Sequence, residues 1–447
     1  MLKVFLLLIL LSASASLWAG PMTIIDTQEA MNSYIENGKF NGVILVAQDK
    51  KILFKKAFGL KNLTSNIPLS ADDKFLIGSN TKQFVAASLL KLKEEGKISL
   101  DDNIVKYLPQ YSVFKNITIR DLLNHTSGIV NFTDVPEFWN LVEYDKGLDL
   151  DDIINFSASY PLNFESKTNW SYSNTGYIIA GKIVELVSGK SWDSYIKNEF
   201  LNPLKMNNTG YEEYYEKVTD VDGHLLENGV LVPNVKKFNM TWALSAGALY
   251  STVDDLLKWT AIYTDSDLLS EASKKEMQTP FKADYGLGIW VGKYNNETKI
   301  NHGGSVPGFV SDFTYLKESK MTVITLDNVD GYFSPADLIL DYFSKGKAAV
   351  VKYDFYAIDN EKLKDYTGTY KLGRVDCQVF IKNNKLFLQP NDGQPAYELV
   401  ANDKDSFRLL PYNFGEEFVR NADGVVTEFI HYQSGNVSIA KKKLSVN

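Results

Sequence analysis

The amino-acid sequence predicts an α+β protein in which an antiparallel sheet flanked by helices carries a helical lobe and is followed by a small all-β domain. Three observations support this fold class. Short β-rich runs with turn-rich gaps occur near the N-terminus and return between residues 285 and 326. Between about residues 100 and 240 the pattern is mostly that of helix and loop. After about residue 350 only short β-rich runs recur.

The first twenty residues differ from the rest of the chain. Lys3 precedes a short apolar run, and small residues follow it. This is the pattern of a secretory signal peptide, and the run is too short to be a good transmembrane helix. We assign residues 1–19 to the signal, with cleavage after Ala15 or Ala19. The expected product is exported, periplasmic or secreted, without stable membrane insertion; the alternative is an uncleaved membrane anchor.

Composition limits the partners of the chain. It has 447 residues, a net charge of −8 and no basic tract, so nucleic acid is not an expected partner. Cys377 is the only cysteine, which excludes an internal disulfide. The sequence contains neither a His-Glu-x-x-His motif nor a cysteine cluster, and no metal or other cofactor is expected.

The N-terminal part is predicted to begin with a helix over residues 26–38, opened by a capping box. Strands follow over residues 42–48 and 51–58, joined by a tight turn. A helix with an apolar face then begins near Ser79 and stops at Gly96.

The helical lobe is predicted from apolar periodicity and capping residues. A short helix over residues 117–123 ends in a turn at His125–Gly128, and residues 177–187 form a strongly apolar helix. Further helices begin at the capping residues Ser191 and Ser251.

Strands return after this lobe, with short gaps that suit antiparallel pairing. They cover residues 285–291, 299–302, 309–316 and 321–326. Ser334 and Pro335 open a last helix that ends at Gly346. We assign residues 24–346 to one α+β domain and expect the functional site in a cleft between its lobes.

Residues 355–447 follow a different pattern. Seven short β-rich runs between Gln378 and Ala440 are separated by turn pairs such as Asp392–Gly393 and Ser434–Gly435. The pattern predicts a meandering antiparallel sheet, either a small barrel or a sandwich, without a catalytic cluster.

Ser79 and Lys82 are three residues apart and therefore share one face of their predicted helix. They would hold a hydroxyl beside an amine at the positive end of the helix, where the dipole favours an alkoxide or a neutral amine. A serine can become nucleophilic in this way without histidine. On local sequence alone Ser79 is as well explained as a helix cap. The same spacing occurs at Ser88/Lys91, Ser112/Lys115, Ser194/Lys197, Ser344/Lys347 and Ser438/Lys441.

Two further stretches distinguish Ser79 from these pairs. Tyr172 and Asn174 lie in a predicted loop that leads into a helix and offer a phenol and an amide. His302 is followed by Gly303 and Gly304 where a predicted strand ends, and glycines there let a ligand approach the backbone. Taken singly, His302 is better explained as an ordinary polar residue near a turn.

Together the three stretches resemble the serine β-lactamase and penicillin-binding-protein-like hydrolases of the class C type. Ser79-Asn-Thr-Lys82 matches the nucleophile motif and Tyr172-Ser-Asn174 the second motif, while His302-Gly-Gly304 stands where many members have Lys-Thr-Gly. The resemblance spans about residues 24–346 and implies a β-lactamase/transpeptidase-like fold. The remaining β region resembles the lipocalin-like domain often appended to such hydrolases.

The resemblance implies acyl transfer through a serine ester, with Ser79 as nucleophile. Lys82 and Tyr172 would act as general base and acid, and which of them takes the first proton stays open. Asn174 would position the substrate, and the oxyanion would lie between the backbone N–H groups of Ser79 and Ser305. The implied substrate-binding residues are Asn174, His302, Gly303, Gly304 and Ser305.

The histidine in the third motif bears on the substrate. A lysine there would supply a permanent positive charge for a substrate carboxylate, whereas histidine is mostly neutral near pH 7. We therefore expect an exported serine hydrolase of small amides or esters, such as D-amino-acid peptides or carboxylic esters. The alternatives are a β-lactamase proper, or a penicillin-binding sensor or idle relative that binds or acylates without turnover. The expected partner is a small-molecule or peptide substrate.

Overall fold

The computed structural model describes most of the chain. The described residues are 40–142, 146–227, 230–234, 239–330, 336, 339–340, 358–373, 375–391, 396–410, 414–433 and 436–443. The predicted signal peptide, the predicted helix over residues 26–38 and most of the helix expected at 334–346 lie outside these ranges. Within them, no helix combines the length and apolar character needed to cross a membrane.

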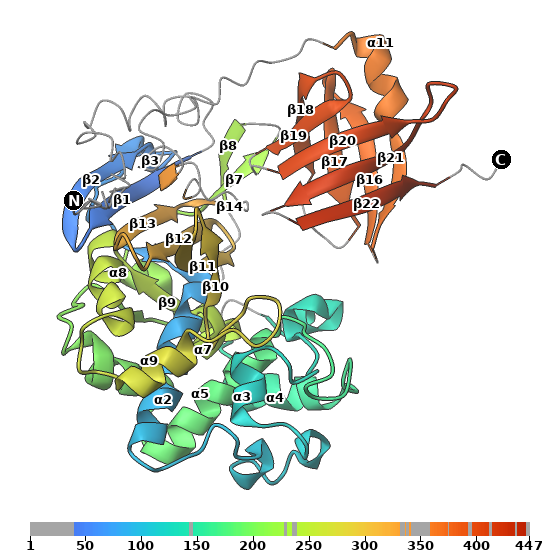
Figure 1. Cartoon of the computed structure of the whole chain (residues 1–447). Helices are drawn as coiled ribbons and strands as arrows, with labels where there is room; N and C mark the ends of the chain where they lie inside the picture. The colour runs from blue at the N-terminus through green and yellow to red at the C-terminus, as the bar shows by residue number, and fades with distance from the viewer. Residues whose placement is uncertain are drawn as a thin grey trace, which may run out of the picture.

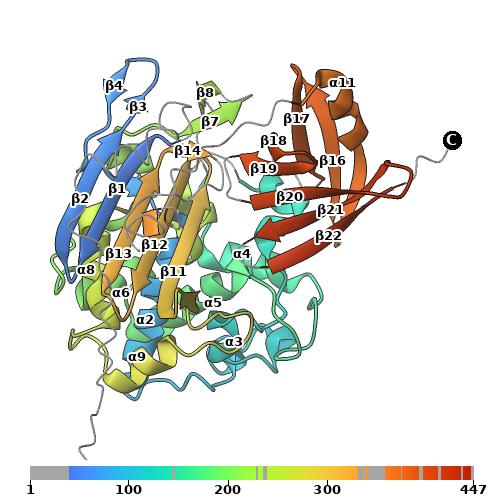
Figure 2. The same ribbon diagram turned by 45° about the horizontal axis from the view of Figure 1, so that its top comes forward.

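The main sheet is antiparallel, with the strand order β10-β11-β12-β13-β1-β2 (Figures 1 and 2). Its strands are β1 (Gly42–Gln48), β2 (Lys51–Phe58), β10 (Trp290–Tyr294), β11 (Glu297–Val306), β12 (Phe309–Leu316) and β13 (Met321–Asp327). β1 pairs with β13 along its whole length, so the two ends of the domain meet inside one sheet. Because side chains of a strand alternate between faces, Val43 and Leu45 join the large core on one side, and Ile44 and Val46 join a smaller core on the other.

Two predicted strands differ from the observed ones. The strand predicted over residues 285–291 begins only at Trp290. Gly288 precedes it in a turn with a φ of +75°, where a Cβ would lie 2.8 Å from the backbone of the buried helix below. β11 does not end at Gly303–Gly304 but continues to Val306. Gly304 lies within the strand because the backbone of Ile77 packs closely against it there.

The helices from α2 to α9 lie on one side of the sheet and form the lobe below it in Figure 1, whereas the helical residues Ala336, Ile339 and Leu340 pack on the other side. The helices of the lobe are α2 (Thr81–Glu94), α3 (Ile119–Leu123), α4 (Leu150–Ala158), α5 (Asn174–Ser188), α6 (Trp192–Ile196), α7 (Leu244–Gly247), α8 (Val253–Trp259) and α9 (Glu271–Met277). α2 packs among α5, α6, α7 and α9. It is buried continuously from Thr81 to Leu90, and Phe84 stacks on Trp259 with ring centroids 3.9 Å apart. α5 begins at Asn174, three residues earlier than predicted, and ends at Gly189 in the left-handed conformation.

Short strands complete this part of the chain. They are β3 (Leu60–Asn62), β4 (Ile67–Pro68), β5 (Phe75–Leu76), β6 (Gly210–Tyr211), β7 (His224–Glu227), β8 (Val230–Pro233), β9 (Leu249–Ser251) and β14 (Val329–Asp330). The β5–β9 pairing is the one that matters for the site, because β5 delivers the chain into the turn that precedes α2.

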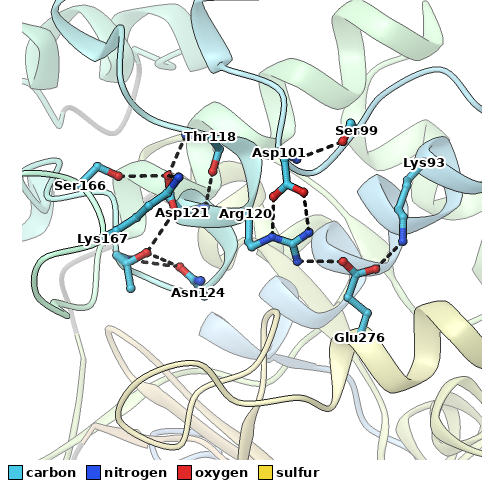
Figure 3. A network of polar contacts seen from close by, with 11 residues as sticks. Lys93, Ser99, Asp101, Thr118, Arg120, Asp121, Asn124, Ser166, Lys167 and Glu276 are labelled. Atoms are coloured by element: carbon cyan, nitrogen blue, oxygen red, sulfur yellow. Dashed lines mark hydrogen bonds and ion pairs between the residues drawn. The ribbon is translucent and has the colours of Figure 1, made fainter.

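A polar network fixes α3 to its neighbours (Figure 3). Arg120 bridges Asp101 and Glu276, and Lys93 also pairs with Glu276, so α2, α3 and α9 are tied together. Asp121 forms a capping box with Thr118 at the start of α3. α3 therefore holds the turn that follows it, at His125, in a defined position.

The C-terminal strands form a closed eight-stranded barrel. They are β15 (Gly368–Leu372), β16 (Val375–Lys382), β17 (Lys385–Pro390), β18 (Tyr397–Asp403), β19 (Ser406–Leu410), β20 (Phe414–Arg420), β21 (Val426–Gln433) and β22 (Asn436–Lys442). A short helix, α11 (Asn360–Leu363), precedes them, and Tyr366 just after it packs against Phe407 and Phe418 in the barrel core. β15 is the strand that the sequence pattern did not indicate; it closes the barrel by pairing with β22.

Candidate active site

The candidate site is a cavity of about 650 Å³ between β11 and the helical lobe. Seven of the eight residues predicted from the sequence line it: Ser79, Tyr172, Asn174, His302, Gly303, Gly304 and Ser305. The eighth, Lys82, is completely buried and contacts Ser79 from the protein interior. Segments that are far apart in the sequence thus meet at one place.

Ser79 lies in a single 3₁₀ turn, Gly78–Asn80, immediately before α2. Gly78 has a φ of +51°, and a Cβ on it would lie 2.6 Å from the backbone nitrogen of Ser305. A Cβ on Gly304 would lie 2.0 Å from the Ile77 carbonyl oxygen. Glycine is therefore required on both sides of this contact, which brings β11 directly against the serine turn.

Lys82 is placed to accept the proton of Ser79. Its Nζ lies 2.9 Å from Ser79 Oγ, 2.7 Å from Asn174 Oδ1 and 2.7 Å from the Ala246 carbonyl oxygen. Burial lowers the pKa of Lys82 well below its usual value, because the charged form loses its hydration. A neutral amine has two N–H donors and one lone pair. The Asn174 and Ala246 oxygens only accept, so they take both donors and leave the lone pair for the Ser79 hydroxyl.

The backbone N–H of Ser305 points away from β12. Val306 and Phe309 close a two-residue hairpin turn, and the closing pair of such a turn is hydrogen-bonded. Along an antiparallel pair of strands, hydrogen-bonded and non-hydrogen-bonded residue pairs alternate. Ser305 and its partner Val310 come next to the closing pair, so they are not hydrogen-bonded to each other. On its other edge β11 pairs with β10 only as far as Asn301. The N–H of Ser305 therefore faces the cavity, beside the Ser79 turn.

Tyr172 is held by His125, a residue that the sequence did not assign to the site. The backbone N–H of Ser171 donates to the His125 carbonyl at 3.0 Å, and that of Ser173 donates to His125 Nδ1 at 3.1 Å. The centroids of the His125 and Tyr172 rings lie 4.2 Å apart. His125 itself is fully buried and has a φ of +62°. His125 thus fixes the backbone on both sides of Tyr172, through its carbonyl oxygen on one side and its ring nitrogen on the other.

Asn174 connects Lys82 to a loop that the sequence also did not assign. Its Nδ2 donates to Thr133 Oγ1 at 3.1 Å, and its backbone N–H donates to Asn131 Oδ1 at 2.9 Å. These bonds orient the amide so that Oδ1 faces Lys82. The loop thereby becomes part of the cavity wall.

His302 is a neutral member of the site. Its Nδ1 lies 2.5 Å from the Gly303 carbonyl oxygen, which only accepts, so Nδ1 carries the proton. Nε2 lies 2.9 Å from the Tyr285 hydroxyl and accepts from it. Burial, with a smaller contribution from Lys82, lowers the pKa of His302 to about 3. The ring is therefore uncharged at any pH near neutrality.

Aromatic side chains form much of the cavity wall. Trp139 and Trp242 have ring centroids 5.2 Å apart, and Trp170 and Trp290 have theirs 5.5 Å apart. Both pairs line the cavity. Among the residues that the structure describes, no cluster of three or more His, Cys, Asp or Glu side chains could hold a metal ion.

Known proteins are similar to this chain both in sequence and in structure. Residues 27–341 match the family model described as Beta-lactamase. Penicillin-binding protein 4* of Bacillus subtilis (strain 168) is 29% identical over 439 residues, which cover 90% of this chain and 94% of that protein. The octameric penicillin-binding protein homologue from Pyrococcus abyssi has a TM-score of 0.66 at 25% identity, over 93% of this chain and 100% of that one. The D-amino acid amidase from Ochrobactrum anthropi SV3, complexed with L-phenylalanine amide, shares the fold, with a TM-score of 0.63 at 23% identity over 72% of this chain and 97% of that one.

Proposed function

The chain belongs to the beta-lactamase family, and from this premise we propose that it is a serine hydrolase that cleaves small amides or esters through an acyl-enzyme. The predicted family and the predicted fold, with its appended β domain, are confirmed; the class C type stays a prediction. The observation that carries the proposal is the hydrogen-bonding of Lys82, whose lone pair is left for Ser79.

In the proposed reaction Ser79 Oγ attacks the substrate carbonyl carbon, and its proton passes to the neutral Lys82 amine or, where Tyr172 acts as the base, to the Tyr172 phenolate. The carbonyl oxygen becomes an oxyanion bound by the N–H groups of Ser79 and Ser305; losing one such donor typically costs about a hundredfold or more in rate. Tyr172 then protonates the leaving nitrogen or oxygen; where Lys82 took the first proton, it passes this proton on to Tyr172. Water hydrolyses the resulting ester by the reverse proton path.

The substrate proposal rests on His302. Because its ring is neutral, it offers no ionic partner to a substrate carboxylate. This supports small amides and esters, such as D-amino-acid peptides or carboxylic esters, over β-lactam antibiotics. We also propose that the protein is exported, as the N-terminal sequence pattern suggests.

Active-site labelling tests the proposal. A fluorophosphonate probe should label the wild-type chain at Ser79, and the protein should hydrolyse p-nitrophenyl esters. Ser79→Ala should lose both properties. Ser112→Ala is the matched control, because Ser112 has the same spacing to Lys115 but lies exposed in a surface turn; it should behave as the wild type. An unlabelled wild type, or labelling that persists in Ser79→Ala, would overturn the nucleophile assignment.

A penicillin-binding sensor is the second candidate, and the name of the Bacillus subtilis relative favours considering it. Such a protein would be acylated without turnover. Labelling of Ser79 with no more than one ester or amide molecule cleaved per active site would favour the sensor. Multiple turnovers per active site would favour the hydrolase.

A further inference from the structure

A second cavity, of about 410 Å³, lies in the helical lobe. Its wall includes side chains of α2, α3 and α9, the residue that follows α3, and the segment that follows α9. None of the residues that line it also lines the active-site cavity. We call it the α3–α9 cavity. Its volume falls in the range of small-molecule sites, about 300–1,000 Å³.

The charges around the α3–α9 cavity leave one cation without a partner. Glu276 pairs with both Lys93 and Arg120, and Arg120 also binds Asp101; Figure 3 shows these side chains turned toward one another. Lys275 lines the cavity too, and its side chain has no ion pair or hydrogen bond among the described residues. Three cations therefore face two carboxylates, and one negative charge on a ligand would balance them.

Asn124 supplies an unused donor in the same wall. It is only 2% exposed. Its Oδ1 accepts from the backbone N–H of Thr126 at 3.2 Å and from the Thr126 hydroxyl at 2.7 Å, and because a backbone N–H only donates, this atom is the oxygen. Nδ2 has no hydrogen-bond partner among the described residues, so it is the polar atom left to face the cavity. A buried donor without a partner is costly, and an acceptor on a ligand would satisfy it.

Another part of the wall is apolar. Phe281 is 57% exposed, the largest fraction among the large apolar side chains that the structure describes. Pro280 and Leu287 line the cavity with it. The backbone N–H of Phe281 donates to the Tyr285 carbonyl at 3.1 Å, which holds the turn that carries the ring. The α3–α9 cavity thus offers both a basic and an aromatic surface.

We propose that the α3–α9 cavity binds a small monocarboxylate that carries an aromatic or other apolar group. The carboxylate pairs with Lys275 and accepts from Asn124 Nδ2, because a charged acceptor makes the stronger hydrogen bonds. The apolar group packs on Phe281. This site goes beyond the proposed acyl transfer and does not depend on it.

Calorimetry on the full-length protein tests the inference. It compares phenylacetate with phenylacetamide, its neutral counterpart, and with acetate, which lacks the ring. Phenylacetate should bind about tenfold more tightly than either. Lys275→Gln should lower the preference for phenylacetate over phenylacetamide about three- to fivefold, since it removes the unpaired charge. Lys115→Gln is the matched control, because Lys115 is an exposed lysine that lines neither cavity; it should behave as the wild type.

Asn124→Asp gives a sharper result. Aspartate keeps an oxygen for Thr126 and places a negative charge where the amide donor was, so the preference should reverse in favour of phenylacetamide, which a loss of folding would not produce. Thermal unfolding is compared with that of the wild type, and Lys275→Gln decides the question if Asn124→Asp does not fold. Equal binding of phenylacetate and phenylacetamide by the wild type, or no binding of either, would overturn the inference. A preference unchanged in both variants would place the carboxylate elsewhere and overturn it as well.

Discussion

Complete burial determines the chemistry of Lys82. In water its amine would be charged at neutral pH and could not accept the Ser79 proton. Among the described residues, its hydrogen-bonding partners are neutral oxygens rather than carboxylates, so no opposite charge offsets the lost hydration and the pKa of Lys82 is lowered. The same three contacts then direct the lone pair of the neutral form to the hydroxyl.

This lowered pKa predicts the pH dependence of the reaction. If Lys82 is the base, as proposed, it acts in its neutral form, so kcat/KM should rise with pH through its lowered pKa and then level off well below 10.5, the usual value for lysine. The measurement is kcat/KM for p-nitrophenyl acetate from about pH 5 to pH 9, corrected for spontaneous hydrolysis. A kcat/KM that still rises in proportion to hydroxide concentration at pH 9, without levelling off, would contradict an amine that is neutral because it is buried.

His302 predicts the response to β-lactams. His302→Lys places a permanent charge on the cavity wall and should speed acylation by a carboxylate-bearing fluorescent penicillin about tenfold. His302→Gln adds no charge and should give no such gain. Both variants change the contact with the Tyr285 hydroxyl. The thermal unfolding of each is therefore compared with that of the wild type, to separate an effect of charge from a loss of stability. An equal rate of acylation in the two variants would show that charge at this position does not control binding of the antibiotic.

Local sequence predicted the residues of the site that lie in recognisable patterns and missed those that do not. Ser79, Lys82, Tyr172 and His302 stand in short motifs. Asn131 and Thr133 are single polar residues about forty positions from Asn174, their partner, and only the folded chain brings them together. The predicted catalytic roles stay predictions until the labelling and kinetic experiments are done.

At the scale of elements, the turn after α3 positions the loop before α5. His125 accepts backbone N–H groups on both sides of Tyr172. His125→Ala should therefore lower kcat about ten- to hundredfold with a smaller change in KM, since a misplaced Tyr172 impairs proton transfer more than binding. Single-turnover acylation and steady-state kinetics measure this split.

His125→Asn serves as the control for this prediction. Asparagine tolerates the positive φ of this position and offers an oxygen near the place of Nδ1. It should restore part of kcat, whereas alanine provides neither property. Equal losses in the two variants, or a loss confined to KM, would mean that His125 supports packing rather than the position of Tyr172.

Sequence patterns predicted elements well where the pattern was local. The strands at 42–48, 51–58 and 309–316 were found because apolar β-rich runs end at clear turns. The strand predicted at 285–291 was wrong in its first part, because tight packing against α2 requires a glycine turn there. β11 was predicted too short, since glycines inside a strand resemble a stop unless the opposing segment is known.

At the scale of the whole molecule, the chain has separate cores. The large core of the beta-lactamase-family domain and the core of the barrel share no residue. Closure of the barrel depends on β15 meeting β22, about seventy residues later, which explains why the sequence could not distinguish a barrel from a sandwich. The boundaries predicted for the domains stay predictions.

Separate cores predict separate unfolding. Phe418 lies in the barrel core among Phe407, Phe429 and Tyr370. Phe418→Ala should destabilise the barrel by about 3–5 kcal/mol, as expected for a large core cavity, and leave fluorophosphonate labelling of Ser79 unchanged. Calorimetry should show two unfolding transitions, of which only that of the barrel shifts to lower temperature in Phe418→Ala. Val425→Ala, an exposed position on the barrel, is the control, and a shift of both transitions together in Phe418→Ala would contradict independent cores.

The position of β1 between β13 and the edge strand β2 has a consequence for synthesis. β1 is apolar and almost wholly buried, yet its partner β13 is made about 280 residues later. At about 5–20 residues per second, β1 waits roughly 15–60 s before its second neighbour exists. During that time only β2 covers it, so the nascent chain presents an unpaired apolar strand edge, which is a site for aggregation. Expression yield should therefore depend on how well the N-terminal hairpin is shielded during translation, and slow synthesis at low temperature with abundant chaperones is the condition that favours soluble protein.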